Sequence, residues 1–142
     1  MIISSELALK ALTVGLQKSH ELKEPSSLAI VDAGGNLLAY IRELEAGLAT
    51  VVIAQAKAYT ALALRSPSGD WMEAAQPGGA LYGLNHLGDN RPIVVFGGGL
   101  PVFSDGRLVG AVGVSGGPVP ADVAIAEIMV ATLLSAETKR EA

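Results

Sequence analysis

The sequence of 142 residues contains no cysteine. This absence excludes disulfide bonds, thiolate nucleophiles, and zinc or iron–sulfur sites that are held by cysteine. It is also typical of proteins from a reducing compartment. Any catalytic or binding chemistry must therefore come from other side chains.

Charge is scarce as well. Only 17% of the residues are charged, and the formal net charge is −4. Binding to nucleic acid needs a clustered basic surface, and the sequence has no such cluster. The N-terminus lacks the basic start and continuous apolar core of a signal peptide, and no uninterrupted window reaches transmembrane length. We therefore expect a cytoplasmic protein that contacts neither nucleic acid nor a membrane.

Aromatic residues make up only 4% of a chain that is 50% hydrophobic, so the apolar residues are mostly Ala, Val, Leu and Ile. Small aliphatic side chains favour close packing of helices on a sheet. The length suits one domain spanning residues 1–142, which would bury about two-thirds of the surface that its unfolded chain exposes.

The pattern of apolar residues predicts an α+β fold. The predicted helices cover residues 5–24, 48–65, 68–75 and about 118–136. The predicted strands cover residues 27–32, 37–42, 93–96, 100–103 and 107–114. Two predicted hairpins, with turns at 33–36 and 105–106, imply a mainly antiparallel sheet of five strands flanked by the helices. Residues 76–92 contain many glycines and prolines and predict a long loop of the kind that is often functional.

Two of the predicted helices are almost uncharged. Residues 46–64 carry only Lys57, and residues 123–136 carry only Glu127. A helix that is apolar all round must be covered on several sides, and one small sheet cannot cover two such helices completely. We therefore expect a homo-oligomer that buries part of this surface.

Lys57 is the first candidate for binding chemistry, because every neighbouring turn of its predicted helix is small or apolar. An unpaired ammonium in such a place would cost several kcal/mol. The side chain therefore extends to solvent, binds an anionic ligand, or pairs with a carboxylate. The carboxylates considered are Asp32, Glu43 and Glu45. Thr60 shares the face of Lys57.

A second candidate is the segment 113–117, which matches the G-x-S-x-G pattern of serine hydrolases. The histidine of those enzymes follows the serine, whereas His20 and His86 precede Ser115. Ser115, Gly116 and Gly117 offer instead a hydroxyl and backbone N–H groups just before a predicted helix, which is a common anion site. Simple entry into the helix explains the glycines equally well.

The two histidines have different settings. His20 lies near the end of the first predicted helix, where we expect a structural role. His86 lies in the long loop and could reach a ligand. Their positions give no spacing typical of metal ligands, so we predict no metal site and little intrinsic affinity for haem. The glycines do not form a nucleotide-binding pattern.

Four segments together resemble the GlcG/HbpS-like family: residues 29–38, 56–61, 97–101 and 109–117. The resemblance implies a five-stranded antiparallel sheet with profilin-like layering of helices, and assembly into higher oligomers. Some relatives bind haem, a related domain accompanies a corrinoid adenosyltransferase, and others are encoded among genes of catabolism. The resemblance also implies a pocket shared by the family's recurrent polar positions, which here are Asp32, Lys57, Thr60, Ser115 and Asp122.

Three functions remain open at this level. The first is a binding domain for an anionic, carboxylate-bearing metabolite, in which Lys57 faces a pocket closed by residues 76–92 and floored by Gly98, Gly99 and Ser115. The second is an isomerase or hydrolase acting on such a metabolite, with Lys57 or His86 as acid or base. The third is a haem or corrinoid carrier, in which Lys57 meets a propionate and a histidine meets the metal.

The predicted ligand-binding residues are Asp32, Arg42, Lys57, Thr60, Gly98, Gly99, Ser115 and Gly116. Arg42 belongs to this set because it stands at the end of the second predicted strand, where the resemblance to the family retains an arginine. If Lys57 binds the ligand, Lys57→Met should keep the fold and weaken binding by more than about tenfold.

Overall fold

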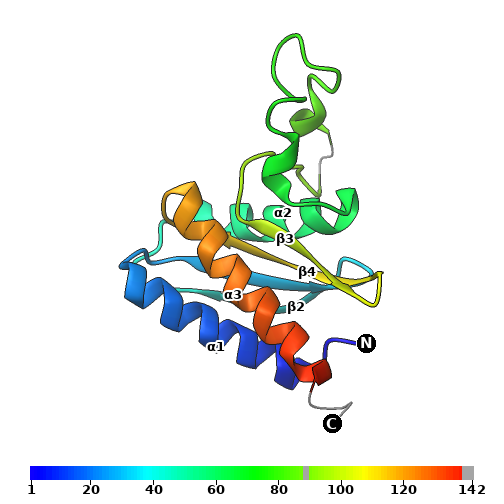
Figure 1. Cartoon of the computed structure of the whole chain (residues 1–142). Helices are drawn as coiled ribbons and strands as arrows, with labels where there is room; N and C mark the ends of the chain where they lie inside the picture. Colours follow the sequence, from blue (N-terminus) through cyan, green and yellow to red (C-terminus); the bar gives the residue numbers. More distant parts are fainter. Residues whose placement is uncertain (88–89, 139–142) are drawn as a thin grey trace.

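The computed structural model describes residues 1–87 and 90–138 (Figure 1). The α-helices in these residues are α1 (Ser5–Leu22), α2 (Ala49–Leu64) and α3 (Val119–Thr138). The strands are β1 (Ser27–Asp32), β2 (Leu37–Arg42), β3 (Gly99–Ser104) and β4 (Arg107–Ser115). Between α2 and β3 lie two 3₁₀ helices, η1 (Ser68–Trp71) and η2 (Leu84–His86). The predicted helix at 68–75 is thus only the short η1.

The described strands form one sheet of four antiparallel strands in the order β2-β1-β4-β3. The prediction of a fifth strand at 93–96 was wrong. The backbone N–H of Val94 donates to Thr60 Oγ1 on α2 at 2.9 Å, and Ser68 Oγ donates to the carbonyl of Phe96 at 2.8 Å. Two backbone groups of this segment are therefore satisfied by side chains of α2 and η1.

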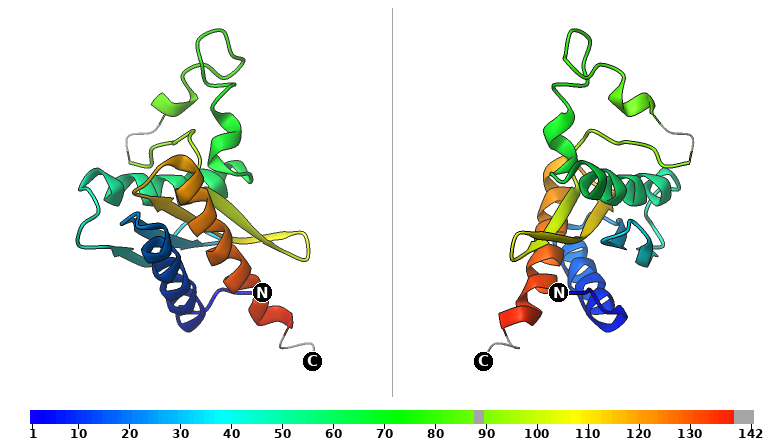
Figure 2. Two further views of the ribbon diagram at one scale, coloured as in Figure 1. Left: turned by 60° about the vertical axis from the view of Figure 1, so that its left-hand side comes forward. Right: turned by 90° about the vertical axis from the view of Figure 1, so that its right-hand side faces the viewer.

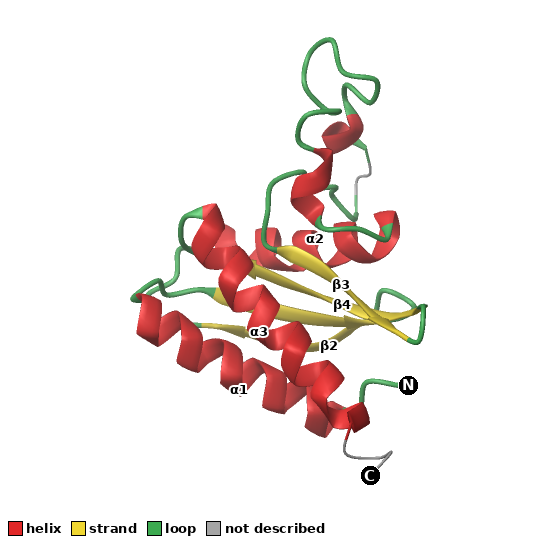
Figure 3. Ribbon diagram, in the orientation of Figure 1, coloured by secondary structure: helices red, strands yellow, loops and turns green. Residues whose placement is uncertain are grey.

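The sheet is covered on both faces (Figure 3). On one face, α1 and α3 pack against Leu28, Ile30 and Val112, and the buried side chains of α3 reach down to Leu133. On the other face, α2 packs its alanines against Ala29, Val31 and Ala111. A Cβ at Gly113 would collide with the carbonyl of Ala54, so the small residues bring the backbone of α2 close to β4. This close approach places Lys57 directly over the sheet.

Helix α3 includes one stretch, Val119–Glu137, that is long and apolar enough to cross a membrane by length and composition. Asp122 and Glu127 interrupt this stretch, so it does not contradict the expectation that no uninterrupted apolar window reaches that length. Ile125, Met129 and Leu133 are nevertheless completely buried between α1 and the sheet. The apolar side chains of α3 thus form part of the hydrophobic core of this fold.

Residues 72–87 form an arm that projects away from the helices and the sheet (Figure 2). Between Gln76 and Leu87 no residue of the arm is buried. The prediction that the loop at 76–92 closes over Lys57 was therefore wrong for residues 76–87.

Candidate functional site

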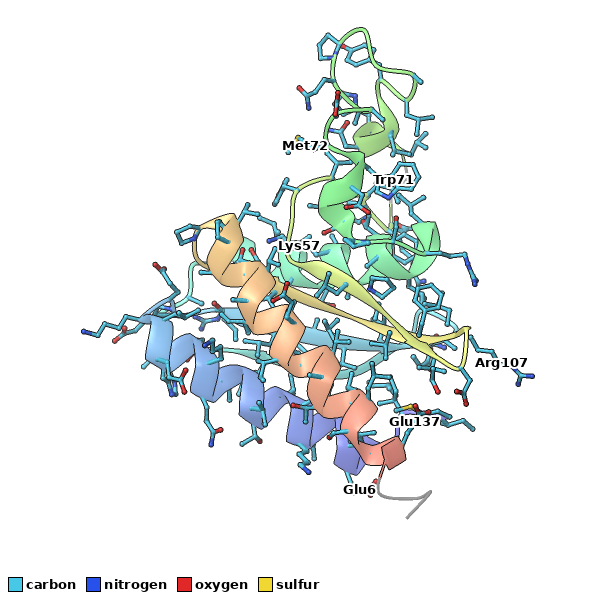
Figure 4. All side chains as sticks on the ribbon, in the orientation of Figure 1. Glu6, Lys57, Trp71, Met72, Arg107 and Glu137 are labelled. Carbon is cyan, nitrogen blue, oxygen red and sulfur yellow. The ribbon has the colours of Figure 1, made fainter. Side chains whose placement is uncertain are left out.

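Lys57 lies on the face of α2 that meets β4, and its ammonium is enclosed (Figure 4). Nζ donates to Asp122 Oδ2 at 2.9 Å and to the carbonyl of Val114 at 2.8 Å. The two side chains of this ion pair are 1% and 3% exposed. The ring of Phe96 adds a cation–π contact, with its centroid 5.2 Å from Nζ.

Asp122 lies in the first turn of α3, and its second oxygen, Oδ1, accepts the backbone N–H of Gly117 at 3.0 Å. The anion that the lysine and the segment 115–117 both attract is therefore a side chain of the same chain. None of the carboxylates considered in the sequence analysis is the partner of Lys57: Asp32 ends β1 at the β1–β2 turn, and Glu43 and Glu45 follow β2. Only the family resemblance named Asp122.

Burial lowers the pKa of Lys57, and the hydrogen bond and the charge of Asp122 oppose this effect. The paired carboxylate favours the ammonium form, in which each charge has a partner. A bound metabolite could reach Nζ only if the surrounding structure opened. The geometry therefore makes the pair structural.

Gly98 and Gly99 make room for Lys57. Gly98 has a φ of +124°, and a Cβ there would lie 2.6 Å from the carbonyl oxygen of Val114 and 2.7 Å from Lys57 Nζ. A Cβ at Gly99 would collide with the carbonyl of Lys57. The structure thus brings both glycines beside Lys57, as predicted, but they close the space around its ammonium.

Three other predicted residues support the same region. Ser115 ends β4, is buried, and pairs with Ser27 of β1. A Cβ at Gly116 would lie 2.6 Å from Ser26 Oγ, so this glycine allows tight packing before β1. Thr60 accepts the N–H of Val94 and anchors the extended segment beside α2.

Asp32, Arg42 and His86 lie away from Lys57. Asp32 Oδ1 accepts the N–H groups of Gly34 and Asn36 in the β1–β2 turn, each at 2.9 Å. The hydrogen bonds from Asn36 and Gly34 lower the pKa of Asp32, and slight burial opposes them. Arg42 and His86 each lie in a different region from Asp32. Arg42 Nη1 donates to the carbonyls of Glu43, Leu44 and Ala46. His86 is exposed on the arm.

His20 has a setting that its sequence position did not reveal. Its Nε2 lies 2.7 Å from Glu43 Oε1. The other oxygen of Glu43 accepts Ser19 Oγ at 2.8 Å and the N–H of Ser26 at 2.6 Å. Glu43 is therefore fixed in place, whereas the side chain of His20 is 71% exposed. Because Nε2 lies beside this carboxylate, Nδ1 is the ring nitrogen that remains for a ligand.

This imidazole borders an open groove of about 480 Å³ between the end of α1 and the end of β2. Its lining is partly apolar and comprises Leu16, His20, Pro25, Ile41, Arg42, Glu43, Leu44 and Glu45. In the described part of the chain, no three His, Asp or Glu side chains converge to hold a metal ion. The groove can thus supply one imidazole ligand to a metal ion. A single protein ligand is enough for a metal ion whose other ligands belong to a macrocycle.

The comparisons with known proteins agree with the sequence resemblance. The model of the family described as "Haem degrading protein HbpS-like" matches residues 3–131. An uncharacterized 15.0 kDa protein of Citrobacter freundii, from the dhaT-dhaS intergenic region, is 46% identical over 110 residues, which are 78% of this chain and 77% of the relative.

Two further matches involve PduO. The corrinoid adenosyltransferase PduO of Citrobacter freundii is 38% identical over 83% of this chain, but the match spans only 35% of that protein. The solved structure named "Crystal Structure of PduOC:Heme Complex" is 34% identical, has a TM-score of 0.87, and is covered over 95% of its length by 93% of this chain. By the family match and these identities, the chain belongs to the HbpS-like family.

Proposed function

We propose that this chain binds haem, or a closely related iron tetrapyrrole, and that His20 supplies a ligand to the iron. The observation that carries the proposal is the exposed imidazole in a partly apolar groove, on a chain that resembles a haem-bound relative over nearly its whole length. Bound haem would supply an iron centre for ligand or electron chemistry.

Glu43 is the group that prepares His20 for this role. A carboxylate that accepts one imidazole N–H fixes the ring orientation and raises the basicity of the other nitrogen. Glu43 can do so because Ser19 and Ser26 hold its second oxygen. Leu16, Ile41 and Leu44 supply apolar surface for a macrocycle beside this nitrogen. This context was not visible in the sequence, and it replaces our expectation of little haem affinity.

The two other functions receive less support. Lys57 cannot meet a metabolite or a propionate while its ammonium is held by Asp122 and Val114. Acid or base catalysis by Lys57 and His86 is also disfavoured, because one is enclosed in the body and the other is exposed on the arm. A relative that carries corrinoid adenosyltransferase activity is much longer than this chain, so that activity is not proposed here.

Titration of haemin into the purified protein, followed by the Soret band, tests the proposal. We expect saturable binding by the wild type and a loss of at least about tenfold in affinity for His20→Ala. His86→Ala is the matched control, because it removes the other histidine and should leave affinity unchanged. Glu43→Gln should weaken binding by about tenfold, since it removes the charge behind the imidazole.

Circular dichroism of each variant separates loss of binding from loss of fold. If His20→Ala binds haemin as tightly as the wild type, His20 is not the ligand. If the wild type gives no saturable Soret change, the proposed function itself fails.

A further inference from the structure

A second cavity, of about 320 Å³, lies at the opposite end of β2 from His20. The β1–β2 turn, helix α2 and residues 90–92 enclose it. Its walls include Val31, Leu37, Val52 and Ala56, and its polar groups include Gln55, Tyr59 and Arg91. The volume is at the lower end of the range of about 300–1,000 Å³ that is usual for small-molecule sites.

Arg91 is an exposed residue whose guanidinium lies between the Tyr59 ring and the β1–β2 turn. The centre of its guanidinium lies 5.0 Å from the centroid of the Tyr59 ring, which is a cation–π stacking distance. Gly35 lies beside it: this residue has a φ of +82°, and a Cβ there would be 2.9 Å from Arg91 Nη1. The stacking on Tyr59 favours this position of the guanidinium, and the absence of a side chain at Gly35 leaves room for it.

Arg91 has no carboxylate partner within residues 1–87 and 90–138. The ion pairs found there are Lys18–Glu21, His20–Glu43 and Lys57–Asp122. Asp32 belongs to the turn beside Arg91, but its Oδ1 accepts N–H groups of Gly34 and Asn36. These hydrogen bonds from backbone N–H groups offset part of the negative charge of the Asp32 carboxylate. Among the described residues, therefore, no carboxylate takes up the donors of Arg91.

We propose that this cavity binds a small organic carboxylate with an apolar body. Arg91 would donate two parallel hydrogen bonds to the carboxylate, a geometry that guanidinium and carboxylate groups favour. The apolar body would lie against Val31, Leu37 and Val52. This site is separate from the groove beside His20. The sequence analysis placed the anionic ligand at Lys57, whereas this proposal places it at Arg91.

Isothermal titration calorimetry with benzoate as the probe tests this site, and benzamide serves as its neutral counterpart. We expect saturable binding of benzoate and at least tenfold weaker binding of benzamide. Arg91→Gln should weaken benzoate binding by at least tenfold, whereas Arg91→Lys should retain part of it. Arg65→Gln is the matched control, because Arg65 also stacks on an aromatic ring, that of Phe103 at 5.7 Å, but does not line the cavity.

Equal affinity for benzoate and benzamide, equal affinity of Arg91→Gln and wild type, or no saturable binding of benzoate at millimolar concentration would each overturn the assignment. Because the titration uses protein free of haem, failure of the Soret experiment does not affect this test. The two sites can thus be judged separately.

Discussion

Lys57 and Asp122 depend on each other, because each is almost completely enclosed and each is the other's ion-pair partner among the described residues. Removing one partner of a buried ion pair leaves the second charge without water and without a counter-charge. Such a change typically costs about 3–5 kcal/mol, although the intact pair contributes little against an apolar replacement.

We therefore expect Lys57→Met to destabilise the fold by about 3–5 kcal/mol in urea unfolding. This reverses the outcome that the sequence alone suggested. The double variant Lys57→Met with Asp122→Asn should recover most of the loss, since the amide oxygen can still accept the N–H of Gly117. A Lys57→Met protein as stable as the wild type, with reduced ligand binding, would restore the ligand-binding role of this lysine.

Asp32 gives a prediction for the dependence of stability on pH. Its folded-state pKa is lowered from the usual 3.8, chiefly by hydrogen bonds from Asn36 and Gly34. Because the folded pKa lies below the unfolded one, the ionised carboxylate stabilises the fold fully above about pH 4, and this contribution is lost as the pH falls through the lowered pKa. Asp32→Asn should thus reduce the melting temperature at pH 7 and have a smaller effect at pH 3. A difference that is equal at both pH values would contradict this account.

At the level of elements, the extended segment before β3 depends on backbone geometry at Gly98. Alanine at this position would meet both an unfavourable φ of +124° and crowding by Val114 and Lys57. We expect Gly98→Ala to lower the free energy of unfolding by about 2–4 kcal/mol. Gly106→Ala is the control for φ alone, since Gly106 has a φ of +75° and open space around it, and should cost only about 1–2 kcal/mol. Equal losses would show that crowding at Gly98 is unimportant.

The elements differ in how far local sequence determines them. The strands β1 and β2 have the predicted bounds, because two short apolar runs joined by a turn rich in glycine and asparagine define a hairpin locally. The segment 93–96 is a short apolar run, and such a run fits a strand or an extended segment packed on a helix. Only the tertiary structure shows that the N–H of Val94 donates to Thr60 Oγ1 on α2.

The same distinction applies to the sites. Lys57 was recognisable because it is the lone charge of an apolar helix, but its partner is 65 positions away in the chain. The pairing of His20 with Glu43 also joins separate elements, α1 and the end of β2. Arg91 gave no signal, because a charged residue in a loop rich in glycine is usually solvated. Its stacking on Tyr59 is visible only in the fold.

At the scale of the whole molecule, several apolar surfaces remain uncovered. On the arm, Tyr82 and Leu87 are 65% and 60% exposed, and the arm has no buried residues of its own beyond Gln76. Near the start of α2, Leu44 and Leu48 are 87% and 85% exposed. A projecting segment with large apolar side chains and little charge gains stability when a partner surface covers it.

We therefore propose that copies of this chain associate, as the uncharged helices suggested, and that the arm takes part in the contact. Light scattering at micromolar concentration should give a mass that is a multiple of 14.5 kDa. Replacing Tyr82 and Leu87 together by serine should lower this mass or raise the concentration needed for association, because it removes the apolar surface of the arm. Leu9→Ser is the matched control, since Leu9 is a similarly exposed residue on the body. A mass of 14.5 kDa for the wild type would contradict self-association, and a shift caused by Leu9→Ser alone would place the contact on α1 instead of the arm.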